Sequence, residues 1–257
     1  MVDLVAFPAF LLILTRVSAF FLTIPVFSNK NLPVMHKIGL SLFLAWIMLY
    51  AVDPKPIPLD ATFFLLIIKE AMVGLSIGFI AAIVFYAIQV AGGFIDLQMG
   101  FAIANVFDPQ TGIQTPLMGR YLYTFAILFL LATDAHHMLL DGIFYSYKFL
   151  PLDSTISNFG DGGITRFVIS VFSGMFLVAL QMAIPIVGTL FLADLALGIV
   201  ARTVPQMNIF VIGLPVKILI ALVLFLVVMP AFFVSVQMLV DQMRDSMINL
   251  MELLGAA

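Results

Sequence analysis

Residues 71–95 read AMVGLSIGFIAAIVFYAIQVAGGFI and contain no charged side chain. A helix needs about 20 apolar residues to cross a hydrocarbon core about 30 Å thick, so this run predicts a membrane-spanning helix. Two more charge-free runs, residues 167–193 and 218–240, predict two further spans. Pro185 and Pro230 lie inside these runs and should kink both helices. The sequence therefore predicts an all-α protein that crosses the membrane repeatedly.

Three weaker apolar runs bring the predicted number of spans to about six. They are residues 4–27, which Arg16 interrupts, residues 38–52, which are short for a span, and residues 121–133, which end at Asp134. An even number of spans places both termini on one side of the membrane. The Lys and Arg residues are divided too evenly among the connections to fix the orientation.

The composition agrees with a protein surrounded by lipid and other protein. Hydrophobic residues make up 63% of the chain and charged residues 10%, compared with about 25% charged residues in ordinary soluble domains. The net charge of −3 and the scattered Lys and Arg residues provide no basic stripe for nucleic acid. The chain has no cysteine and no phosphate-binding loop, nucleophile elbow or zinc-protease motif. We therefore predict neither an enzyme nor a bound cofactor.

We predict a single multispanning domain over residues 1–240. The similar runs DLQMGF (residues 96–101) and DLALGI (residues 194–199) are each followed by Pro-Gln. They favour either a parallel repeat of two halves, about 1–120 and 121–240, or a coincidence in an apolar chain.

Residues 241–257 are predicted to form an amphipathic C-terminal helix, because apolar residues recur there at helical spacing. The flexible methionines on this face suit a protein groove, and the headgroup layer of the membrane is the alternative. The apolar positions are Met243, Met247, Leu250, Met251 and Leu254.

Polar and small residues inside the spans indicate where helices meet. An arginine at mid-helix costs roughly 2.5 to 3.5 kcal/mol if it faces lipid, so Arg16 should line a pore, pair with a partner or extend to the headgroups. Gly74, Gly78 and Ala82 recur every four residues and form a seam on which a second helix can pack closely. That helix belongs either to this chain or to another subunit.

A polar group follows the fourth predicted span. Asp134, His137 and Asp141 would share one face of a helix, with His136 adjacent. A divalent metal or a proton relay would use such residues. We favour a polar turn at the membrane interface and predict no metal site.

Residues 97–119 form a connection with one charged residue, Asp108, among apolar side chains. Its Asp-Pro-Gln-Thr-Gly run favours a turn, so the segment could fold back into protein as a re-entrant loop. A pore constriction and a buried structural hairpin are both open interpretations. The residues of this candidate plug loop are Asn105, Phe107, Asp108, Pro109, Gln110, Thr111, Gly112 and Ile113.

Three runs resemble the FliR family, the export-gate subunits of flagellar and other type III secretion systems. They are DLALGIVARTVPQMNIFVIGLPVKI (residues 194–218), GGFIDLQMGFAIANVFDPQTGIQTP (residues 92–116) and ATDAHHMLLDGIFYSYKFLP (residues 132–151). Length and span number agree as well, so the resemblance covers essentially the whole chain.

The resemblance implies kinked helices arranged as hairpins within a helical, hetero-oligomeric pore. The partners that it implies for this chain are FliP and FliQ homologues, an FlhB homologue, membrane lipid and unfolded flagellar export substrates. The location that it implies for this chain is the bacterial cytoplasmic membrane at the flagellar basal body. The resemblance also implies that the loop described above acts as a plug that narrows the closed pore. It implies a conduit that draws its energy from elsewhere in the apparatus.

Two alternatives remain from other classes of protein. One is a small-solute secondary transporter with the two similar runs as half-sites, and the other is an assembly scaffold without a pore.

We expect contacts with other subunits at two places. The first is the Arg16 region with its glycine seam. The second is the turn after residue 202, where a guanidinium and amides beside a proline favour docking onto exposed carbonyls. The predicted contact residues are Arg16, Gly74, Gly78, Arg202, Pro205, Gln206 and Asn208.

Overall fold

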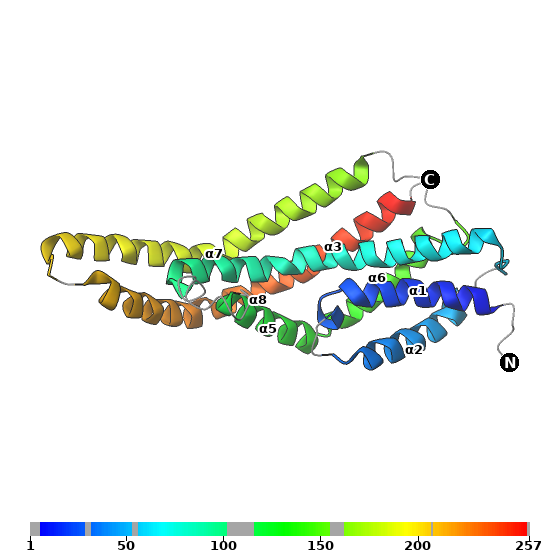
Figure 1. The fold of residues 1–257 in the computed structure, drawn as a ribbon, viewed down its shortest axis with the longest axis horizontal. Helices are drawn as coiled ribbons and strands as arrows, with labels where there is room; N and C mark the ends of the chain where they lie inside the picture. The colour runs from blue at the N-terminus through cyan, green and yellow to red at the C-terminus, as the bar shows by residue number, and fades with distance from the viewer. Residues whose placement is uncertain are drawn as a thin grey trace. The chain divides into compact units, whose positions relative to one another are not determined.

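A computed structural model describes residues 6–28, 32–52, 56–101, 116–154, 162–206 and 208–255. Every regular element in these ranges is a helix (Figure 1). The elements are α1 (Phe7–Thr23), η2 (Val26–Ser28), α2 (Val34–Val52), α3 (Ala61–Met99), α5 (Leu117–Ala132), α6 (Ala135–Phe149), α7 (Gly163–Thr203) and α8 (Ile209–Gly255). The prediction of an all-α, multispanning membrane protein is confirmed.

In the described residues each of the six predicted spans contains a helix, but the helix lengths differ from those predicted. Four helices of the described chain, α2, α3, α7 and α8, are long and apolar enough to cross a membrane, and the interrupted pair α5 and α6 could supply a fifth span. Helix α1 is apolar but has only 17 residues. By contrast, α3, α7 and α8 have 39, 41 and 47 residues. The spans predicted for α3, α7 and α8 were too short because a charge ends an apolar run without ending a helix.

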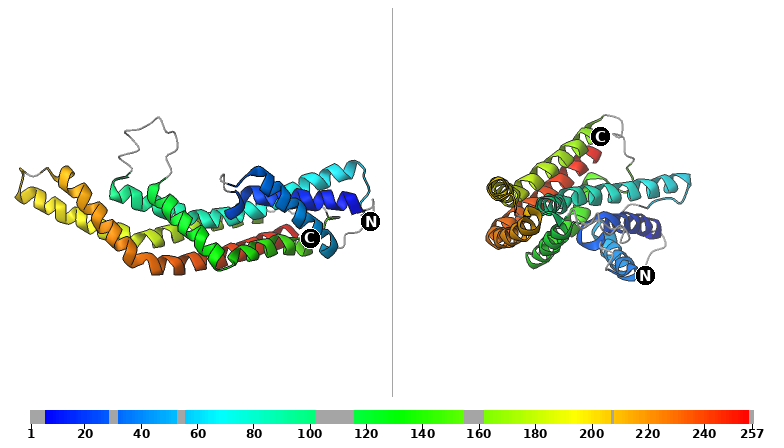
Figure 2. Two further views of the ribbon diagram at one scale, coloured as in Figure 1. Left: turned by 90° about the horizontal axis from the view of Figure 1, so that it is seen from below. Right: turned by 60° about the vertical axis from the view of Figure 1, so that its left-hand side comes forward.

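The chain divides into two compact units. Unit 1 comprises residues 1–85, 133–172 and 240–257, and unit 2 comprises residues 86–132 and 173–239. In unit 1, α1 and α2 run side by side (Figures 1 and 2). In unit 2, the C-terminal part of α7 and the N-terminal part of α8 run side by side (Figure 2). The repeat of two halves stays a prediction.

The predicted C-terminal amphipathic segment is helical and continues α8 without a break as far as Gly255. Its five apolar positions, listed above, are all buried, while Arg244, Asp245 and Glu252 on its other side are exposed. A Cβ atom on Gly142 of α6 would lie 2.4 Å from Cε of Met247. The methionine-rich face therefore packs in a groove of this same chain, which is the first of the two environments expected for it.

The glycine seam of α3 packs against α1. A Cβ atom on Gly74 would lie 2.2 Å from the backbone oxygen of Arg16, and one on Gly78 would lie 2.1 Å from Oγ1 of Thr23. Real Cβ atoms are not found at such distances, so only glycine permits this approach. The helix that uses the seam thus belongs to the same chain.

Replacing Gly74 with alanine should lower the free energy of unfolding by about 1 to 3 kcal/mol, because the new methyl group displaces the backbone of α1. Gly39 of α2 is a matched control, since a Cβ atom there would meet nothing within 4 Å. Gly39→Ala should be neutral or stabilising by up to about 1 kcal/mol. Thermal unfolding of the full chain in detergent, followed by the fluorescence of Trp46, measures both. Equal effects of the two substitutions would show that the seam does not determine the packing.

Candidate functional site

A buried arginine forms the centre of unit 1. Arg16 has an exposed fraction of 0%. Its Nη2 donates to Oε1 of Glu70 at 2.9 Å and to the carbonyl of Leu150 at 2.8 Å, and its Nη1 donates to Oγ of Ser146 at 2.9 Å. Its Nε also pairs with Oε2 of Glu70. The ring of Tyr147 lies 4.0 Å from Cζ, so the guanidinium is surrounded by partners.

A second cation shares the same carboxylate. Nζ of Lys69 lies 2.9 Å from Oε1 of Glu70 and donates to the carbonyls of Pro151 at 2.6 Å and Leu152 at 3.3 Å. These carbonyls lie just after the C-terminal end of α6, where the helix dipole is negative and carbonyls lack helical donors. The end of α6 therefore stabilises the positive charge that Glu70 alone does not balance.

The cluster joins α1, α3 and the end of α6 within one chain. Glu70 was not predicted as a partner of Arg16, because the two residues lie 54 positions apart and no local sequence pattern connects them. The structure places Arg16, Gly74 and Gly78 in contacts inside this chain. Four hydrogen bonds hold the guanidinium to groups of this same chain.

The other four predicted contact residues lie on the surface. Arg202 is in the last turn of α7. Pro205, Gln206 and Asn208 follow in the link to α8, and all four residues are exposed. A subunit contact at this link stays a prediction.

Unit 2 holds its own polar cluster, which the sequence did not predict. Gln98 of α3 donates from Nε2 to Oδ2 of Asp194 at 2.8 Å, and Nζ of Lys217 lies 2.8 Å from Oδ1 of the same carboxylate. Oδ1 and Oδ2 of Asp96 accept from the backbone N–H of Met118 at 3.1 and 3.0 Å. The aspartates of the two similar runs thus each join their helix to a later one, Asp96 to the first turn of α5 and Asp194 to Lys217 of α8.

Large apolar side chains are exposed along much of α7 and α8. On α7 they recur from Ile169 to Val200, and on α8 from Val211 to Met238. At 1.5 Å per residue these stretches are about 46 and 40 Å long. A hydrocarbon core of about 30 Å covers only about 32 Å of a helix at the usual tilt of about 20°. The hydrocarbon core therefore leaves part of each apolar stretch for protein neighbours or the headgroup layer to cover.

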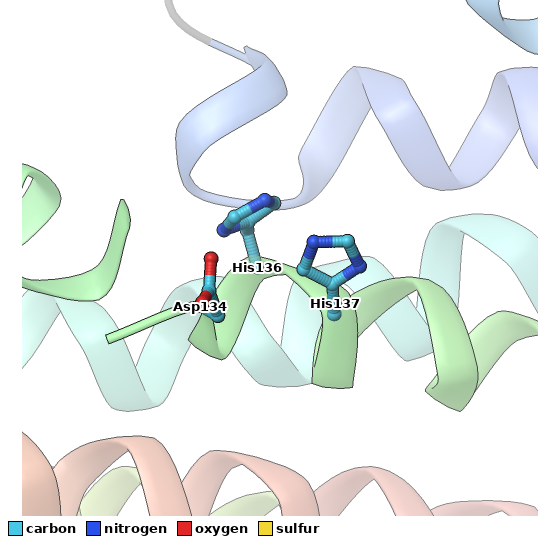
Figure 3. A group of neighbouring side chains, drawn as sticks. All are labelled: Asp134, His136 and His137. Atoms are coloured by element: carbon cyan, nitrogen blue, oxygen red, sulfur yellow. The ribbon is translucent and has the colours of Figure 1, made fainter. Parts of the chain in front are cut away.

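Two further predicted groups remain. The plug-loop residues Asn105, Phe107, Asp108, Pro109, Gln110, Thr111, Gly112 and Ile113 lie outside the described residues. Within the described part of the chain, one group of side chains could hold a metal ion, namely Asp134, His136 and His137 (Figure 3).

Comparisons with known proteins agree with the resemblance. The family described as "Bacterial export proteins, family 1" matches residues 7–243. The flagellar biosynthetic protein FliR of Bacillus subtilis is 50% identical over 98% of this chain and 97% of its own length. FliR of Escherichia coli is 29% identical over 84% of this chain and 82% of its own. The Yop proteins translocation protein T of Yersinia pestis is 34% identical over 88% of each chain.

Removing one partner of the buried ion pair should strongly destabilise unit 1. Glu70→Ala leaves two cations without their carboxylate, and Arg16→Ala removes the hydrogen bonds that Glu70, Ser146 and the carbonyl of Leu150 accept from the guanidinium. Each should lower the free energy of unfolding by about 3 to 5 kcal/mol. The yield of folded chain and its unfolding in detergent measure the loss.

The control is Lys148→Ala, which removes an exposed cation 4.6 Å from the ring centre of Tyr145. Solvent screens this contact, so its loss should cost little. If Glu70→Ala and Lys148→Ala lower the free energy of unfolding equally, the buried pair is not what holds α1 to α3.

Proposed function

This chain belongs to family 1 of the bacterial export proteins, and we propose that it forms part of the pore through which a type III export gate passes unfolded proteins. It is a multi-pass membrane protein and a subunit of a type III export apparatus. In our proposal it lies in the bacterial cytoplasmic membrane at the flagellar basal body, and the exported substrates are unfolded flagellar proteins.

The observation that carries this proposal is the length of the exposed apolar surface on α7 and α8. The hydrocarbon core covers only part of each stretch, and we propose protein neighbours for the remainder. A hetero-oligomer with FliP and FliQ homologues, joined by an FlhB homologue, would supply them. We place one contact at the exposed link of Arg202, Pro205, Gln206 and Asn208, where a guanidinium and two amides are available to partner carbonyls.

The proposed role is that of a conduit and not of an enzyme. The family is a structural component of the export apparatus, and its relatives are named for flagellar biosynthesis and protein translocation. These comparisons favour protein export over the alternative of a small-solute secondary transporter. In this proposal the energy for transport comes from other parts of the apparatus.

The experiment uses the absence of cysteine from the chain. Leu226 of α8 is 74% exposed and Val236 of the same helix is 0% exposed. After co-expression with FliP and FliQ homologues, Leu226→Cys should crosslink to a partner subunit through a thiol-reactive reagent, and Val236→Cys should not. The chain should also co-purify with both partners. A chain that purifies alone, with Leu226→Cys uncrosslinked in the membrane, would contradict the proposal.

We also propose that the loop from Asn105 to Ile113 closes the resting pore. Deleting residues 106–111 should leave the assembled gate intact but permeable to ions, because the deletion removes the apolar constriction that keeps the channel dry. Ion flux into vesicles that contain the purified complex measures this. An assembled deletion variant with the same ion permeability as the unaltered complex would contradict the proposed plug. Failure to assemble would indicate a structural hairpin instead.

A further inference from the structure

A short interruption between two helices sets the position of one carboxylate. Helix α5 ends at Ala132 and α6 begins at Ala135. Between them, Asp134 has φ 55° and ψ 15°, in the left-handed region that aspartate tolerates better than most residues. Asp134 occupies the N-cap position of α6, yet its side chain makes no capping hydrogen bond. The carboxylate is exposed and thus available to another ligand.

Two histidines of the first turn of α6 lie beside this carboxylate. The ring centres of His136 and His137 are 4.3 Å apart. One oxygen of Asp134 and one ring nitrogen from each histidine all lie within 4.8 Å of one another. Figure 3 shows the three side chains projecting from the same side of the ribbon at the start of α6.

One of these histidines has an unsatisfied nitrogen. Nδ1 of His136 is buried and has no hydrogen-bond partner in the described structure. A buried polar atom without a partner is unfavourable, and a bound cation would supply the missing partner. A neutral imidazole nitrogen is a common ligand of transition metals.

We propose that Asp134, His136 and His137 bind a divalent transition metal, with Zn²⁺ as the preferred ion. Two imidazoles and one carboxylate suit Zn²⁺, whereas Ca²⁺ and Mg²⁺ prefer oxygen ligands. Tetrahedral Zn²⁺ holds its ligands about 2.0 to 2.2 Å from the metal, so the three atoms must approach one another. Rotation of the exposed Asp134 and His137 side chains can provide this movement. Three protein ligands leave a fourth position for water or a partner's side chain.

The metal would hold the residues between α5 and α6 against the first turn of α6. Asp134 belongs to the interruption, and both histidines belong to the first turn of α6. The sequence pattern grouped Asp141 with Asp134 and His137, but the structure groups His136 in its place. The difference arises because Asp134 precedes the helix in a left-handed conformation, so helical spacing from it does not apply. Asp141 instead lines a groove with Arg244 and Met247.

The test titrates the full chain with metal in detergent, using an affinity tag without histidine. After chelation and dialysis, Co²⁺ should give the visible absorption of a tetrahedral site, and Zn²⁺ should displace it at one ion per chain. His136→Ala and His137→Ala should each weaken Zn²⁺ binding by more than about tenfold, at least the effect of losing a supporting residue at other metal sites. Asp134→Asn should weaken binding while keeping a residue that tolerates the left-handed conformation.

His36 provides the matched control. The chain has three histidines, and His36 of α2 is exposed and outside the group. His36→Ala should bind Zn²⁺ like the unaltered chain. No binding by the unaltered chain, or equal binding by the double variant His136→Ala with His137→Ala, would overturn the proposal and indicate adventitious surface binding. These measurements use the chain alone, so their result does not depend on whether it forms a pore.

Discussion

The buried pairing of Arg16 with Glu70 is the interaction on which unit 1 depends. Taking a charge out of water costs several kcal/mol, so a guanidinium at this position requires a carboxylate and a full set of acceptors. Glu70 comes from α3, and the remaining acceptors come from α6 and the residues that follow it. Apolar packing has no direction, but these hydrogen bonds do. They therefore fix how far α1 can slide or rotate along α3.

Unit 2 is held by carboxylates, one buried and one partly exposed. Asp194 is held between an amide and an ammonium group, and Asp96 accepts from the start of α5. Helix α3 therefore carries a polar anchor in each unit, Glu70 in the first and Asp96 in the second. Long apolar helices have few other features that distinguish one register from the next. The small number of charged residues in this chain increases the structural importance of each one.

The sequence predicted what depends on local periodicity. The apolar runs located the spans, the spacing of Met243 and Met247 identified a face that is buried, and the Gly74 and Gly78 seam identified a close helix contact. Pairings between distant segments were not predictable in this way. Nothing local connects Arg16 with Glu70, or Gln98 with Asp194. The lengths of α3, α7 and α8 were also missed, because hydropathy reports where lipid is favourable and not where backbone hydrogen bonding stops.

The prolines inside α7 and α8 have a consequence for the surroundings of these helices. Pro185, Pro215 and Pro230 lack the N–H group that would bond the carbonyl four residues earlier. The acceptors left without this donor are the carbonyls of Gln181, Val211 and Leu226. Hydrocarbon offers no donor, and an unsatisfied carbonyl in lipid costs several kcal/mol. Each proline therefore marks a place where an otherwise apolar helix favours water or a donor side chain as its neighbour.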